Sequence, residues 1–186
     1  MNAQPTALDF LLADLDTALA DVKAAARVTR LLESYAAARS EDWRRFALFD
    51  ASSYSRNLVR RSDLYELIVL CWSQGQRSPI HDHAGQRCWM AVLDGAVRES
   101  MFIPDPAGGR LREGAVREFG PGRVAFITDE AGWHRIEPSA GRSAVTLHLY
   151  SRPIGACRIY DEAREAVVER IMRYHSIGGL LQPVGA

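Results

Sequence analysis

The alternation of apolar and polar positions divides the chain into a helical first quarter and a longer part made of short strands. Between residues 6 and 47, apolar side chains recur every three or four residues, which is the spacing of one face of a helix. Thr6 and Asp9 resemble a capping box at the start of the first helix. A second helix is predicted over 22–38, and Ser40 is expected to cap a short third one. We expect these helices to pack on the outside of the protein.

From residue 54 onward, short apolar-rich runs are separated by segments rich in Gly, Pro and Asp, such as 104–109. The apolar run Leu67-Ile-Val-Leu-Cys-Trp72 predicts a buried strand. Strands are predicted over residues 54–60, 64–72, 88–93, 97–103, 123–127, 134–137 and 144–151. Many short strands at fairly regular spacing favour a mainly β fold, either an antiparallel sandwich or a jelly-roll barrel.

The segment 161–174 fits two structures on its own pattern. Its Glu, Ala and Arg composition favours a helix by propensity. Residues 170–175 fit a late strand equally well, so the pattern alone leaves both open.

The composition excludes several classes of protein. Lys plus Arg and Asp plus Glu both number 23, so the formal net charge is zero and gives no electrostatic case for a nucleic acid or an anionic membrane as partner. The first residues lack the basic and apolar segments of a secretory signal, and no run of about 20 apolar residues is present to span a bilayer. Three cysteines argue against a disulfide framework and fit a reducing cytosol.

The length of 186 residues suits one generous domain, and no repeat or long linker divides it. We therefore expect a single domain over 1–186, with helices in 1–48 and a β-barrel that carries the functional site in 54–178. We also expect a cytoplasmic monomer with no obligatory protein partner.

Two histidines one residue apart, His81 and His83, are expected at the start of a strand. Side chains alternate along a strand, so both imidazoles would project to one face and could bind one metal ion. An isolated pair of this kind is usually structural, because a metal site needs three or four donors. Here the pair stands in the frame Gly75-x5-His81-x-His83-x4-Cys88-x6-Gly95. This frame resembles the first motif of the cupin superfamily, with Cys88 where most cupins carry Glu.

A glycine turn at Gly122, a strand and then His134 resemble the second cupin motif, with one residue more than its commonest spacing. The two resemblances in this order imply a metal-binding cupin whose ligands are His81, His83 and His134. Because Cys88 replaces the usual Glu, three neutral imidazoles would leave the ion its full positive charge for exogenous anions such as a substrate thiolate.

A closer resemblance then emerges along the strands. The segments 54–59, 81–88, 132–137 and 147–151 resemble those of the cysteine dioxygenases, which are thiol dioxygenases of the cupin superfamily. The likeness runs from about Tyr54 to about Gly178. It implies a cupin jelly roll and an enzyme that oxidises L-cysteine with dioxygen to cysteine sulfinic acid, with Fe(II) as its metal.

The resemblance also implies roles for individual residues. The three histidines would be the iron ligands. Arg56 matches the residue that holds the substrate carboxylate, a role that suits a bidentate guanidinium, and Tyr54 matches a pocket tyrosine on the same strand face. Cys88 and Tyr150 match a pair that forms a thioether cross-link, and the Tyr150 hydroxyl would donate a hydrogen bond to bound substrate or superoxide. His148 matches a residue that hydrogen-bonds this tyrosine.

The family pattern bears on three further places in the chain. It implies a β-hairpin over 156–175, with its second strand at 170–175, in place of the helix that propensity favours. Arg152 stands where animal members have Pro, so a cis peptide bond found there is expected to be absent or altered. Pro138 stands where the second motif often has Asn.

Two alternative functions stay open at this point. A thiol dioxygenase for 3-mercaptopropionate is the nearer one, but members with that preference usually carry Gln in place of Arg56 and lack Cys at the Cys88 position. The other is a non-catalytic metal-binding cupin, against which stand the polar side chains that converge on the open face of the site. Structural roles are expected for Cys71, Cys157 and His175.

Overall fold

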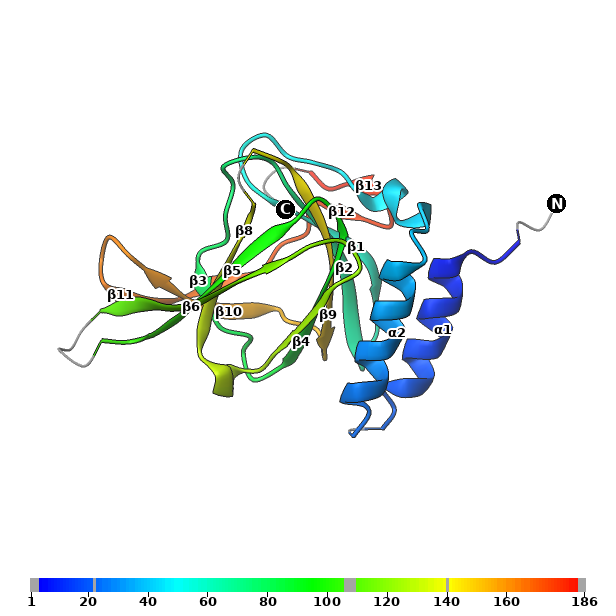
Figure 1. Ribbon diagram of the computed structural model, residues 1–186, viewed down its shortest axis with the longest axis horizontal. Helices are drawn as coiled ribbons and strands as arrows, with labels where there is room; N and C mark the ends of the chain where they lie inside the picture. The colour runs from blue at the N-terminus through cyan, green and yellow to red at the C-terminus, as the bar shows by residue number, and fades with distance from the viewer. Residues whose placement is uncertain (1–3, 22, 106–109, 140, 184–186) are drawn as a thin grey trace.

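The structure of the protein is a computed structural model that describes residues 4–21, 23–105, 110–139 and 141–183. Two β-sheets face each other, and two N-terminal helices lie against the outer face of one of them (Figure 1). The prediction of a mainly β fold with helices packed outside is confirmed.

The N-terminal helices are α1 (Ala7–Ala18), α2 (Ala25–Ala37) and the short 3₁₀ helix η1 (Asp42–Phe46). The predicted capping box is confirmed, because the Asp9 amide donates to the Thr6 hydroxyl at 3.3 Å and the Thr6 amide donates to the Asp9 carboxylate at 2.8 Å. The N-cap residue of η1 is Glu41 and not Ser40 as predicted, although the Asp42 amide donates a long hydrogen bond of 3.5 Å to the Ser40 hydroxyl. The start predicted for the second helix, residue 22, lies outside the described residues. Within the described part of the chain, no helix has the length and apolar character needed to cross a membrane.

The strands of the first sheet follow the order β13-β12-β1-β2-β9-β4-β7, and those of the second follow β11-β10-β3-β8-β5-β6. Neighbouring strands are antiparallel, except that β1 and β12 run parallel. The first sheet comprises β1 (Ser55–Arg61), β2 (Tyr65–Trp72), β4 (Arg87–Asp94), β7 (Val124–Ile127), β9 (Ala144–Ser151), β12 (Ser176–Ile177) and β13 (Leu180–Leu181). The second comprises β3 (Ile80–His81), β5 (Val97–Pro104), β6 (Leu111–Phe119), β8 (Trp133–Pro138), β10 (Ala156–Asp161) and β11 (Ala166–Ile171). A further 3₁₀ turn, η2 (Asp129–Ala131), precedes β8.

Each of the seven strands predicted from the pattern is present; the strand expected at the histidine pair is only the two residues of β3, and the two-residue strands β12 and β13 were not predicted. The strand β6 was also missed, because most of its side chains are exposed and it has no buried alternation to signal it. The turn predicted at 104–109 falls mainly on residues outside those described.

The predicted hairpin over 156–175 is confirmed in its outline. The strands β10 and β11 pair from Ala156 opposite Ile171 to Asp161 opposite Ala166, so strand pairing prevails over the helical propensity of the segment. The second strand ends at Ile171, which makes the prediction of a strand over 170–175 wrong beyond that residue. Every peptide bond among the described residues is trans, including the one between Ser151 and Arg152, where the family pattern is altered.

The continuous apolar run of β2 is explained by burial on both faces of the first sheet. Leu67, Val69 and Cys71 pack toward α1 and α2, whereas Ile68 and Trp72 pack into the space between the sheets. Side chains alternate between the two cores, so nearly every position must be apolar. The functional site is built on the inner of these two faces.

The two glycines that frame the histidine pair have different structural demands. Gly95 has φ of 68°, and a Cβ there would overlap the carbonyl oxygen of Ser143 and lie 3.0 Å from the Cα of Ala144. Gly75 has φ of 82° but has no atom within 4 Å of such a Cβ. Gly95 is therefore required by both conformation and close approach, and Gly75 by conformation alone.

We expect Gly75→Ala to lower the free energy of unfolding by about 1 kcal/mol, the cost of a left-handed backbone with a side chain. Gly95→Ala should cost at least about 3 kcal/mol, because a backbone atom must also move. Urea unfolding of both variants measures the difference. Equal losses would mean that the contact with Ser143 relaxes freely.

Candidate metal centre

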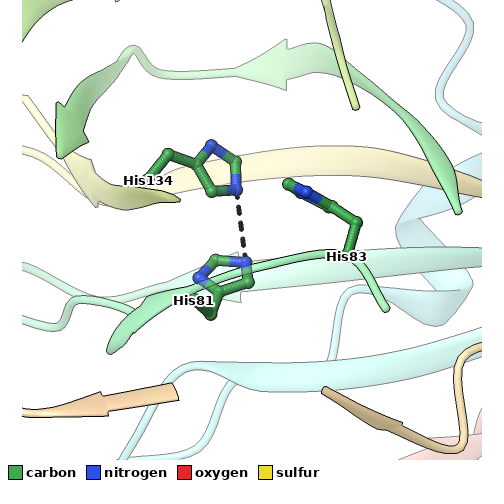
Figure 2. Close-up of side chains that lie close together, drawn as sticks. All are labelled: His81, His83 and His134. Carbon is green, nitrogen blue, oxygen red and sulfur yellow. Dashed lines mark hydrogen bonds between the residues drawn. The ribbon is translucent and has the colours of Figure 1, made fainter. Parts of the chain in front are cut away.

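Three histidine side chains meet between the sheets (Figure 2). One ring nitrogen from each of His81, His83 and His134 lies within 4.8 Å of the other two. His81 ends β3 and pairs directly with His134 of β8 across the ladder. His83 lies just after β3, so the expectation that one strand presents both members of the pair holds only for His81.

The ring orientations of two of the histidines are fixed by hydrogen bonds. His81 Nδ1 lies 3.0 Å from the carbonyl oxygen of Pro79, and His134 Nδ1 lies 2.8 Å from Glu99 Oε1. Both partners are acceptors, so each Nδ1 carries the hydrogen and each Nε2 presents a lone pair. These two Nε2 atoms lie 3.2 Å apart, and a dashed line joins the two rings in Figure 2.

This arrangement fits a cation. Two lone pairs at that distance repel each other unless a proton or a metal ion lies between them. The His83 ring is fully buried, and neither of its nitrogens has a hydrogen-bond partner among the described residues. Three imidazole donors that converge without competing partners match the ligand type of a transition metal.

The histidines are also held in the protonation state that metals require. Burial, together with the neighbouring His83, lowers the pKa of His81 to about 4. Burial lowers the pKa of His134 well below its usual value. At neutral pH the imidazoles of His81 and His134 are therefore uncharged and able to donate a lone pair.

The loop that carries His83 is fixed by Asp129. The carboxylate accepts the backbone amides of His83 at 2.7 Å and Gly85 at 2.6 Å, and one oxygen lies 3.5 Å from His83 Nδ1. The His83 side chain and these amides lower the pKa of Asp129 to about 2, so it remains an anion. The backbone contacts replace the strand that the sequence led us to expect at this point.

Several predicted site residues line a small cavity of about 20 Å³ beside His81. Tyr54, His81, His148 and Tyr150 line it, and most of the rest of its wall is apolar. The Tyr54 ring stacks on Trp72 with a centroid distance of 4.6 Å. The cavity has room for about one water molecule, so a larger ligand beside His81 requires the lining side chains to shift.

Tyr150 and Cys88 are direct neighbours across β9 and β4. Tyr150 is 5% exposed, and its ring centroid lies 6.4 Å from that of His83. Burial raises the pKa of the Tyr150 hydroxyl well above its usual value, so the group is a protonated donor. The proximity is what a cross-link requires, and the cross-link itself stays a prediction.

His148 lies beside Tyr150, with ring centroids 6.2 Å apart. Its Nε2 is 3.0 Å from the hydroxyl oxygen of Thr146, which also accepts a hydrogen bond from the Trp72 indole at 2.9 Å. The hydrogen bond between His148 and Tyr150 stays a prediction.

Arg56 lies next to this pocket but lines a neighbouring groove. Its guanidinium carbon is 5.9 Å from the centroid of the Tyr150 ring, and Nη2 lies 3.2 Å from Glu66 Oε1. The side chain is buried, and its Nε has no hydrogen-bond partner among the described residues. One donor is thus left for a ligand at the edge of the site.

Two buried carboxylates of the site were missed by sequence reasoning, although the sequence carried a signal for each. Glu99 alternates with Val97 and Met101, which are buried, so period two places it on the inner face. Glu66 is the charged residue of the otherwise apolar strand β2 and is 0% exposed. A charge at a position predicted to be buried must have partners, which marks it for attention.

The fold agrees with that of a solved protein from Klebsiella pneumoniae that has a double-stranded β-helix domain. The TM-score is 0.50 and the identity 15%, over 61% of this chain and 84% of that one. At this identity the likeness concerns the fold alone. The fold and the three converging histidines together define a candidate metal-binding cupin.

Sequence comparison gives the family. The profile of the family described as cysteine dioxygenase type I matches residues 3–163. Human cysteine dioxygenase type 1 is 34% identical over 159 residues, which cover 84% of this chain and 79% of the human protein. The Danio rerio protein of the same name is 39% identical over 141 residues, which cover 73% and 69% of the two chains. The chain belongs to the cysteine dioxygenase type I family, and the predictions of this family and of an enzyme are confirmed.

We expect Glu99→Gln to weaken metal binding at least about tenfold, because the amide is a weaker acceptor for His134 Nδ1 and holds the ring less firmly. His134→Ala should abolish binding. Anaerobic competition between the protein and a chromophoric chelator for Fe(II) measures both.

The matched control is Glu137→Gln, which removes a carboxylate from β8 that pairs with Arg98 at the surface. It should bind Fe(II) as the unchanged protein does. Full metal binding by His134→Ala would contradict the ligand assignment, and full binding by Glu99→Gln would contradict the support given by Glu99.

Proposed function

We propose that the protein oxidises the thiol of L-cysteine with dioxygen to cysteine sulfinic acid, using Fe(II) held by His81, His83 and His134. The observation that carries the proposal is the convergence of three imidazoles, two of them oriented by hydrogen bonds, beside a buried tyrosine and a buried arginine. The names of the relatives support the same reaction.

Fe(II), when bound, would supply open coordination positions for a thiolate and for dioxygen, together with the redox chemistry that joins them. The chain's own groups would do the rest. Arg56 binds the substrate carboxylate through the donors that Glu66 leaves free. The Tyr150 hydroxyl, which remains protonated, donates a hydrogen bond to the substrate or to the oxygen species. Apolar walls such as Trp72 keep bulk water away from the reacting sulfur.

The choice between thiols depends on the groups around the substrate carboxylate. Arg56 and Cys88 both match the family members that prefer cysteine over 3-mercaptopropionate.

The single-domain organisation, the monomeric state and the cytoplasmic location stay predictions.

The first experiment is anaerobic reconstitution with Fe(II), followed by oxygen uptake with L-cysteine and 3-mercaptopropionate in parallel. We expect L-cysteine to be preferred and its sulfinate to be the product. Arg56→Ala should raise KM for L-cysteine at least about tenfold, because a charged hydrogen bond to the carboxylate is lost.

Arg60→Ala is the matched control, because Arg60 lies on the same strand and pairs with Asp16 at the surface. It should leave KM unchanged. Preference for 3-mercaptopropionate would reassign the substrate, and a loaded enzyme that takes up no oxygen with either thiol would refute the reaction.

The cross-link has its own signature. Joining Cys88 Sγ to the Tyr150 ring removes one hydrogen from each residue, with dioxygen as the oxidant. We expect peptide mass spectrometry after turnover to show a linked pair lighter by two hydrogens. Cys88→Ser should abolish it, and Cys71→Ser, which alters a buried cysteine on the opposite face of the sheet, should not. A lack of linked peptide after prolonged turnover would contradict the prediction.

A further inference from the structure

A fully buried carboxylate stands beside the predicted reaction site without touching the three histidines. Glu66 is 0% exposed and lies directly opposite Tyr150 across β2 and β9. It therefore faces the space between the sheets, where a lone charge is costly. The hydrogen-bond partners of Glu66 indicate its role.

Both oxygens of Glu66 are occupied. Oε1 accepts from Arg56 Nη2 at 3.2 Å, and Oε2 accepts a short hydrogen bond from the Tyr174 hydroxyl. Arg61 Nη1 donates to the same hydroxyl at 2.7 Å and lies 3.7 Å from Oε2. Burial and the bond to Glu66 raise the pKa of Tyr174 to about 12, so it stays a donor at neutral pH.

These contacts fix the direction of the Arg56 guanidinium. The group is planar and rigid, so holding Nη2 also sets where its other donors point. It lies between two rings, with its carbon 5.9 Å from the centroids of both Tyr150 and Tyr174. Nε, which is buried and has no hydrogen-bond partner among the described residues, is the donor left for a substrate carboxylate.

Main-chain hydrogen bonds also hold Tyr174 close to Arg56. The His175 amide donates to the carbonyl oxygen of Arg56 at 2.7 Å, and Asn57 pairs with Ser176 in the parallel ladder of β1 and β12. Tyr174 is therefore carried beside Arg56 by main-chain bonds, not by its hydroxyl alone.

The charges also suit an anionic ligand. Arg56 and Arg61 share one carboxylate, so the group of three keeps one positive charge. A substrate carboxylate would neutralise it, whereas a thiol without a carboxylate would leave it uncompensated.

We propose that Glu66, held by Tyr174, is a positioning residue that orients Arg56 toward the substrate and thereby sets the preference for carboxylate-bearing thiols. This inference rests on the proposed role of Arg56 in binding the substrate carboxylate. It concerns residues that the family resemblance did not single out.

The test is the binding of L-cysteine and of cysteamine, which lacks the carboxylate, to Fe(II)-loaded protein under anaerobic calorimetry. Tyr174→Phe should weaken L-cysteine binding about fivefold and leave cysteamine unchanged, because only the hydroxyl that holds Glu66 is lost. Glu66→Ala should weaken L-cysteine binding more than about tenfold. Glu66→Gln, which keeps an acceptor for Arg56, should recover most of that loss.

Tyr65→Phe is the matched control. Tyr65 is the strand neighbour of Glu66 and also donates to a carboxylate, that of Asp16 at 2.9 Å, but on the helix-covered face of the sheet. Its removal should leave the ratio of the two affinities unchanged.

The outcomes separate this inference from the function on which it rests. Equal affinities for the two thiols in the unchanged protein would refute the role of Arg56 and the inference with it. A preference for L-cysteine that is undiminished in Tyr174→Phe would refute the inference alone, as would an equal loss for both thiols. Should Glu66→Ala fail to fold, Tyr174→Phe decides the matter.

Discussion

The pairing of His81 with His134 across β3 and β8 is the constraint on which the rest of the site depends. Each ring is turned by an acceptor behind it, so that the two Nε2 lone pairs face one another at 3.2 Å. Left to themselves, these atoms repel each other, and burial keeps water from relieving the repulsion. The fold thus holds the rings in an orientation that a cation relieves. Because the imidazole rings are already oriented, metal binding at such a site requires little reorganisation of the protein.

The neighbouring chemistry is organised by a second ladder. On β9, Tyr150 lies between Glu66 of β2 and Cys88 of β4. All three side chains project to the inner face because they occupy directly paired positions. A shift of one residue in either pairing would turn this set toward α1 and α2. The continuous apolar packing of the outer face therefore also fixes the register of the inner, polar one.

Much of this could be predicted from the sequence, for reasons that differ between residues. The strands of the core can be recognised in the sequence, because burial on both faces requires long apolar runs, as in 67–72. The histidine pair was found from its spacing, although the strand expected to align it is only two residues long and the position of His83 depends on Asp129. No local pattern could reveal that contact, because it joins residues 46 positions apart. The strand β6 was missed because most of its side chains are exposed, and an exposed strand shows no pattern of buried apolar residues in its sequence.

The distribution of negative charge is the feature that unites the site. Three carboxylates lie close to the histidines or their pocket, and each accepts hydrogen bonds from protein groups. Glu99 accepts from the His134 imidazole, and Asp129 accepts from two backbone amides. Glu66 accepts from the Arg56 guanidinium and the Tyr174 hydroxyl. None of the three belongs to the group of converging ligand atoms found in the described part of the chain. A metal held by uncharged imidazoles keeps its full positive charge, and the arginines beside Glu66 keep one more. Two positive centres close to the Tyr150 ring would suit a molecule with an anion at each end, such as a thiolate that carries a carboxylate.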